Sequence, residues 1–137
     1  MTSDTSGLAA FIDGWTTDAS GVKPLFTAMC RTLEAMPGVR VEYKGRPGVS
    51  HSLRGLVQGE RPLFVLVDVI DDDPQNRWLS VCFYADLVSD PDEKGDVVPG
   101  GLMGEDARCF DVDDPQGVEE YMLDRLREAC ATAKARS

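Results

Sequence analysis

The sequence predicts an α+β protein, a two-layer sandwich in which an antiparallel sheet of about five strands carries two long helices on one face. Apolar residues recur at helical spacing near both ends of the chain, whereas apolar and polar residues alternate in the middle, as they do in strands. The strand-like segments follow one another through short turns, which favours antiparallel neighbours. Two helices on one face of such a sheet form a two-layer domain.

The chain is expected to fold as one domain, because 137 residues is a typical length for a single domain. We assign the domain to residues 8–137 and expect residues 1–7 to be a disordered tail. Apolar residues at positions 8, 11, 12 and 15 suit a short helix at the start of the domain.

Two long helices are predicted by their apolar stripes and their end signals. The first covers residues 24–36, because it begins at a proline and is followed by a Pro-Gly pair. The second begins at Pro115 and runs to about residue 134, and its apolar residues form one stripe.

Strand patterns fill the middle of the chain. Two alternating segments flank the turn Arg46-Pro47-Gly48 and predict a hairpin. The next segment is apolar at both parities, as in a central strand, and two more segments follow it. The expected strands are residues 39–44, 49–54, 61–70, 78–88 and 107–112. The segment 89–106, which is rich in Asp, Gly and Pro, is expected to be a long loop.

The net charge of −10 is unevenly distributed. Residues 39–61 hold five basic and two acidic residues, whereas residues 62–114 hold three basic and fourteen acidic residues. Such a negative protein repels nucleic acid and anionic membranes, and no apolar run approaches the ~20 residues of a membrane span. The polar N-terminus lacks the basic residues that begin a signal peptide. We therefore expect a cytoplasmic protein with no nucleic-acid partner and no membrane partner.

The four cysteines, Cys30, Cys82, Cys109 and Cys130, form no C-x-x-C pair and match neither a zinc site nor a dense disulfide framework. We expect them to be reduced and buried, with a redox role as the alternative. No phosphate-binding glycine loop or other cofactor motif occurs in the sequence. We therefore assign no cofactor and no metal ligand.

The predicted hairpin holds the only histidine of the chain, His51. It shares a parity with Val49 and Leu53, which indicates a half-buried position where neighbouring groups bond to its ring. A role in ligand binding is the alternative. Ser50 and Ser52 point to the opposite face, so they cannot complete a catalytic triad with His51.

Alternation gives the two central strands one face for the helices and one outer face. The helix face is wholly apolar and includes Val65 and Val81. The outer face mixes apolar and polar residues, and exposed apolar surface of this kind usually marks an interface or a groove. Its candidate interface residues are Phe64, Leu66, Trp78 and Cys82.

Three covers for the outer face are consistent with the sequence. A second copy of the chain would form a homodimer. A ligand cleft would use Arg54 as an anion clamp and Tyr84 as a wall. The N-terminal segment around Phe11 and Trp15 is the third candidate.

We therefore predict a binding or interaction domain, homodimeric through the outer face, with a protein or an anionic small molecule as a further partner. The alternative is a small hydrolase or transferase in which Arg54 binds the anion. The candidate residues that act on or contact this ligand are Asp68, Tyr84, Asp86 and His51. A third interpretation is a divalent-metal binder at the stretch DVIDDDPQNRW, because hard cations prefer clustered oxygens. The sequence names no catalytic residue.

Four stretches, FIDG…PLFTAMCRTLEAMPGV, VEYKGRPGVSHSLRG, LFVLVDV and the amphipathic C-terminal helix, resemble small bacterial families known only as domains of unknown function. The resemblance covers nearly the whole chain from about residue 8 and implies an α+β fold but no reaction. The helix–strands–helix order is also similar to frataxin-like iron-binding folds. Those folds rely on an acidic first helix, whereas residues 24–36 hold Glu34 as their only acid, beside Arg31.

Overall fold

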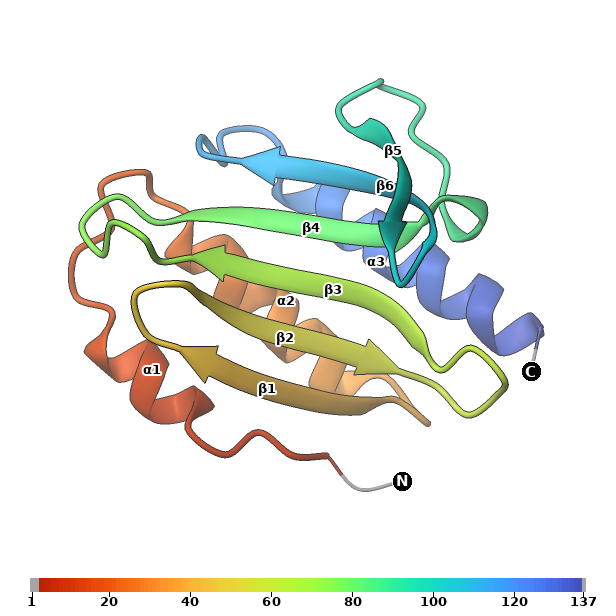
Figure 1. Ribbon diagram of the computed structural model, residues 1–137, viewed down its shortest axis with the longest axis horizontal. Coiled ribbons are helices and arrows are strands. Elements are labelled where there is room, and N and C mark those ends of the chain that lie inside the picture. Colours follow the sequence, from red (N-terminus) through yellow and green to blue (C-terminus); the bar gives the residue numbers. More distant parts are fainter. Residues whose placement is uncertain (1–2, 137) are drawn as a thin grey trace.

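The computed structural model describes residues 3–136. Within that range the chain forms three α-helices, six strands and one short 3₁₀ turn (Figure 1). In chain order these are α1 (Leu8–Gly14), α2 (Lys23–Ala35), β1 (Arg40–Arg46), β2 (Ser50–Leu56), β3 (Leu63–Ile70), β4 (Trp78–Tyr84), η1 (Ala85–Leu87), β5 (Asp96–Leu102), β6 (Glu105–Val112) and α3 (Glu119–Ala135).

All these strands belong to one antiparallel sheet with the order β1-β2-β3-β4-β6-β5. Figure 1 shows α2 and α3 behind the sheet, so that the other face of the sheet is turned to the viewer. The predicted α+β class and the antiparallel sheet are confirmed. In the described part of the chain, no helix has both the length and the apolar composition needed to cross a bilayer.

The prediction of five strands is wrong by one strand, because β5 lies within the predicted loop 89–106. Pro99 and the glycines beside it are poor strand formers, and almost all of β5 is exposed, so no alternation reveals it. The pairing with β6 makes β5 an edge strand, where proline is tolerated. β4 ends at Tyr84, short of the predicted residue 88, because the chain turns at Ala85–Leu87.

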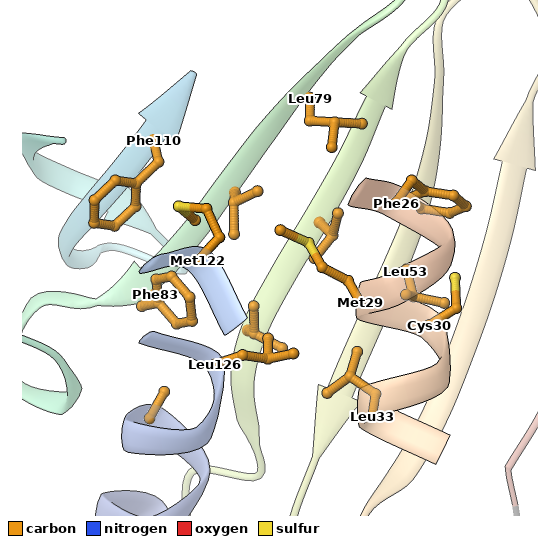
Figure 2. Close-up of a cluster of buried hydrophobic side chains, with 14 of the residues drawn as sticks. Phe26, Met29, Cys30, Leu33, Leu53, Leu79, Phe83, Phe110, Met122 and Leu126 are labelled. Atoms are coloured by element: carbon orange, nitrogen blue, oxygen red, sulfur yellow. The ribbon is translucent and has the colours of Figure 1, made fainter. Parts of the chain in front are cut away.

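The hydrophobic core lies between the two long helices and the helix face of the sheet. Figure 2 shows side chains of β2, β4 and β6 meeting those of α2 and α3. Val65 and Val81 are fully buried, as the alternation predicts. Fully burying one such side chain contributes roughly 1.5–3 kcal/mol. The largest fully buried side chains are Trp15, Phe26, Phe64, Phe83, Phe110, Leu25, Met29, Leu33, Leu53, Leu79, Met122 and Leu126.

Phe64 departs from the predicted alternation. The pairing of β2 with β3 shifts register between Gly55 and Leu56, which leaves Phe64 as the extra residue of an irregularity in β3. Its ring turns into the core, where a Cβ added to Gly55 would lie 2.8 Å from Phe64 Cζ and 3.0 Å from Leu33 of α2. Phe64 is 0% exposed, so its predicted role as an interface residue on the outer face is wrong.

The N-terminal segment lies along the β1 edge of the sheet. Asp4 forms a parallel bridge with Glu42, and its backbone bonds to that of Val41 and Tyr43 at 2.9 Å each. Part of the predicted disordered tail is therefore held against β1, while residues 1–2 and the last residue of the predicted domain lie outside the described residues. α1 follows beside β1 (Figure 1).

The N-terminal segment does not cover the outer face. The Phe11 ring packs on Phe26 of α2, with ring centroids 6.0 Å apart. Trp15 packs on the same ring at 5.9 Å. Both aromatic residues therefore lie on the helix side, and the prediction that they cover the outer face is wrong.

Candidate functional site

We call the side of the sheet that α2 and α3 leave uncovered the open face (Figure 1). Its side chains stand in rows, because residues paired across neighbouring strands point to the same side. The central row consists of Lys44, Ser52, Asp68, Ser80 and Asp111, one residue from each of five adjacent strands. In the middle of this row the Ser52 hydroxyl donates a hydrogen bond to the Asp68 carboxylate. The row therefore runs from a basic end at β1 to an acidic end at β6.

Apolar groups flank the central row on both sides. Ile70 and Trp78 are paired in the row on one side. Leu66 and Cys82 are paired in the row on the other side. All four side chains keep intermediate exposure, so water reaches them. The predicted interface residues Leu66, Trp78 and Cys82 thus share one face.

Cys82 and Cys109 face each other on β4 and β6 and form a disulfide. The prediction of a reduced thiol is therefore wrong for these two, whereas Cys30 and Cys130 are free and buried. Burial raises the pKa of the Cys30 thiol to about 12 and also raises the pKa of Cys130. Lasting disulfides are rare in reducing compartments. The bond counts against the predicted cytoplasmic location, which stays a prediction.

The two margins of the open face carry opposite charges. Lys44, Arg46 and Arg54 are exposed on β1 and β2, and Asp111 and Asp113 are exposed at the end of β6. Among residues 3–136 none of the five has an ion-pair partner. Arg46 makes a single 3.3 Å hydrogen bond to the Ser50 hydroxyl. We call the first group the basic margin and the second the acidic margin.

A pocket of about 550 Å³ opens at the acidic margin. It is lined by Ala19, Ser20, Asn76, Trp78, Asp111 and Asp113. The Ser20 hydroxyl donates a 3.0 Å hydrogen bond to the Asn76 amide oxygen, which joins two loops at the rim. An indole ring beside two carboxylates suits a cation, because the face of a tryptophan attracts cations and carboxylates bind guanidinium groups.

Tyr84 and Asp86 are predicted as parts of a ligand site with Arg54. Tyr84 is the last residue of β4 and Asp86 lies in η1, and both contact Arg61 instead. Tyr84 is 3% exposed, and the guanidinium of Arg61 lies 3.9 Å from the centre of its ring. Asp86 forms ion pairs with Arg61 at 2.7 Å and with Arg136 at 2.8 Å. Burial raises the pKa of Asp86, but the bonds from these two arginines outweigh burial and lower it. Both residues are therefore already partnered, and the predicted anion cleft is not assembled.

His51 lies on the other side of the sheet, in a closed cluster beneath α1. Its Nε2 lies 2.8 Å from Asp71 Oδ2, and its Nδ1 lies 2.8 Å from the Tyr43 hydroxyl. The Phe11 ring stacks on the imidazole with centroids 3.8 Å apart. Asp71 Oδ1 accepts a 2.7 Å bond from Arg77 Nε. Both ring nitrogens are occupied and the residue is 5% exposed, so the predicted ligand contact for His51 is wrong.

We call this group of Tyr43, His51, Asp71 and Arg77 the histidine corner. Burial raises the pKa of Asp71, but hydrogen bonds from Arg77, His51 and the Gly48 amide outweigh burial and lower it. Burial and the nearby Asp71 charge raise the pKa of the Tyr43 hydroxyl. A raised pKa disfavours the phenolate that a nucleophile would need. The histidine corner is therefore a structural cluster that holds α1 on the sheet.

Sequence reasoning missed the partners of His51 and the acidic pocket. Asp71 is predicted as part of the acidic stretch DVIDDDPQNRW, although it continues the inward parity of β3. That parity was the available signal, because Asp71 directly follows β3 and lies two positions after Val69, so an extended chain places it on the helix face as well. Asp113 lies just beyond the end of β6, where alternation gives no assignment.

The predicted divalent-metal site at the Asp-rich loop does not form a cluster. Between residues 3 and 136, no group of three or more His, Cys, Asp or Glu side chains is placed to hold a metal ion. Asp71 turns inward to His51, while Asp73 accepts a bond from the Gln75 amide. Comparisons of this chain with protein-family models, with curated proteins and with solved structures give no match. The resemblance to uncharacterised bacterial families stays a prediction.

Proposed function

We propose that this protein is an interaction domain whose working surface is the open face, and that a second copy of the chain covers this face in a homodimer. The proposal depends on one observation: half-exposed apolar side chains lie on both sides of the central row in the middle of the open face. They include Leu66, Ile70, Trp78 and Cys82, which all keep intermediate exposure. Water contact with such a surface is unfavourable by roughly 25 cal/mol for each Å² of apolar area.

The arrangement of polar groups supports a protein partner better than a small-molecule substrate. Apolar side chains lie on both sides of Ser52 and Asp68, whose side chains bond to each other, and the charged side chains without ion-pair partners stand at the margins. An apolar centre with a polar rim is the usual anatomy of a protein interface. The described residues offer no assembled set of acid, base and anion-binding groups on this face.

Sedimentation of the wild type and of Leu66→Arg tests the proposal. We expect the wild type to sediment as a dimer at micromolar concentration and Leu66→Arg to sediment as a monomer, because a buried unpaired charge at the centre of an interface is strongly unfavourable. Met103→Arg is the matched control. Met103 is 77% exposed on the turn between β5 and β6, outside the central apolar rows.

The wild type and Met103→Arg are expected to behave alike. A monomeric wild type at micromolar concentration would refute the homodimer. A Leu66→Arg variant that dimerises as strongly as the wild type would show that the open face is not the interface. Circular dichroism of Leu66→Arg must match the wild type, so that loss of the dimer is not loss of the fold.

A further inference from the structure

The inference rests on the proposed homodimer and names how the second copy is held. We propose that Lys44 and Arg46 of each copy dock into the acidic pocket of the other copy, with Arg46 beside Trp78 and Asp113 and Lys44 beside Asp111. The pocket of each copy thus receives two side chains of the basic margin, Lys44 and Arg46, from the other copy. Two identical contacts form in each dimer, because a two-fold interface uses the same patches on both copies.

The charges of the two margins select the rotation axis. When two sheets face each other across a two-fold axis, that axis lies in the plane between them. An axis that runs across the strands along the central row sets each strand on itself, so that Lys44 faces Lys44 and Asp111 faces Asp111. An axis parallel to the strands brings the basic margin of one copy to the acidic margin of the other. Only the second choice brings Lys44 toward Asp111 in the central row. In a neighbouring row it also brings Glu42 toward Asp96 of β5, beside Arg54, which pairs with Glu42.

The middle of the strand order lies between β3 and β4. An axis there sets β3 of one copy over β4 of the other and keeps each residue in its own row. Ile70 then meets Trp78, because they share a row, and Asp68 meets the hydroxyl of Ser80. The apolar rows become buried against each other. Asp68, which already accepts a bond from Ser52, gains the Ser80 hydroxyl of the other copy as a second donor. Sheets packed face to face lie about 10 Å apart.

The same rotation places β2 over β6 and β1 over β5, the edge strand beside β6. Lys44 lies in the row of Asp111, so their side chains approach across the interface. Arg46 pairs with Ser50 in the neighbouring row, the row that contains Trp78. The guanidinium of Arg46 can therefore stack on the indole and bond to Asp113, a geometry that arginine favours and lysine does not.

Two charge-reversal variants test the docking. The first is the double variant Lys44→Glu with Arg46→Glu, and the second is Asp111→Lys with Asp113→Lys. Each variant alone places like charges in both contacts of its homodimer, and we expect its dimer dissociation constant to rise by at least about 100-fold. An equal mixture restores opposite charges in both contacts, so a heterodimer as stable as the wild-type dimer is expected.

Arg127→Glu is the control for an unspecific charge effect, because Arg127 is 52% exposed on α3, away from the open face. Its dimer dissociation constant should equal that of the wild type. Charge-reversal variants that dimerise as the wild type does, or a mixture that stays monomeric, would overturn the docking. Neutral variants with Gln at 44 and 46, or Asn at 111 and 113, repeat the test if a reversal fails to fold. Monomeric Leu66→Arg together with dimeric reversal variants would keep the homodimer and reject only the docking.

Discussion

His51 and Ser52 are neighbours in the chain and lie on opposite faces of β2, and their surroundings differ completely. His51 belongs to the histidine corner, where Tyr43 and Asp71 occupy both nitrogens at 2.8 Å each. Ser52 belongs to the central row of the open face, whose end residues Lys44 and Asp111 have no ion-pair partner among residues 3–136. Polar groups are thus satisfied internally in the histidine corner, whereas in the central row Ser52 bonds to Asp68 and the charged ends of the row are left available.

The difference shows which polar cluster is structural and which is a candidate for binding. A buried polar group must be hydrogen-bonded, and removing one partner leaves the other with an uncompensated cost. Substitutions in the histidine corner should therefore lower the free energy of unfolding. Exposed charges contribute little to stability. Substitutions at the margins of the open face should therefore weaken dimer formation instead. The following predictions test this division.

The largest effect on stability is expected from Asp71→Asn. Asp71 and Arg77 are 3% and 13% exposed in their side chains, so the substitution leaves a largely buried guanidinium without its counter-ion. Loss of one partner of such a pair costs roughly 3–5 kcal/mol in the free energy of unfolding. Urea unfolding measures the change. A loss under 1 kcal/mol would contradict the structural role of the corner.

The effect of Asp71→Asn on stability should depend on pH. The pKa of Asp71 is lowered in the folded protein from an ordinary value of 3.8. A carboxyl group of this kind contributes stability that is complete above its unfolded pKa and is lost as the pH falls through its folded pKa. The stability gap between wild type and Asp71→Asn should therefore be constant near neutral pH and close below about pH 4. A gap that widens on acidification would contradict this assignment.

The disulfide is the exception on the open face, because it links residues 27 positions apart. Replacing both cysteines by serine, Cys82→Ser with Cys109→Ser, should lower the free energy of unfolding by roughly 3 kcal/mol. A dithiol reductant should destabilise the wild type and leave the double variant unchanged. Thiol titration of the folded, oxidised protein should find no fast-reacting group, since Cys30 and Cys130 are buried. A fast-reacting pair of thiols in the untreated protein would show that the bond is absent.

A smaller loss is expected from Gly45→Ala on β1. An added Cβ would lie 2.6 Å from the Tyr43 hydroxyl and 3.0 Å from His51 Nδ1, so the bond between them must break. We expect a loss of about 1–2 kcal/mol, the cost of a buried group left without its partner. Gly14→Ala is the control, because no atom lies within 4 Å of its added Cβ. Adding Gly45→Ala to Tyr43→Phe should cost much less than adding it to the wild type.

The smallest effect on stability is expected from Asp111→Asn. Asp111 is exposed and unpaired among the described residues, so its loss should change the free energy of unfolding of the separated chain by under about 0.5 kcal/mol. The dimer dissociation constant of the same variant should increase. A variant that unfolds far more readily while its association is unchanged would reverse the division between the two regions.

Alternation along the chain predicted the two faces of the sheet because packing on one side is a property of every second residue. It placed Val65 and Val81 correctly in the core. It failed at Phe64, since a register shift in the pairing with β2 turns that ring inward. Nothing in the local pattern of β3 specifies such a shift, which depends on the partner strand.

Contacts that join distant segments could not be predicted in the same way. Asp71 and His51 are brought together by the pairing of β2 with β3, and Cys82 and Cys109 by the pairing of β4 with β6. β5 was missed because an edge strand with proline and glycine has no apolar period. The location of the open face was predictable from single strands, whereas its charge margins needed the order of the strands.

The fluorescence of Trp78 tests most directly whether a second copy covers the open face. In Trp15→Phe, Trp78 is the only tryptophan that remains. We expect its emission to shift to longer wavelength and its quenching by acrylamide to increase as the protein is diluted through the dissociation range. The same dilution of Trp15→Phe combined with Leu66→Arg should change nothing, because that chain is already separate. Emission and quenching of Trp78 that do not change across a sedimentation-verified dissociation would contradict the account.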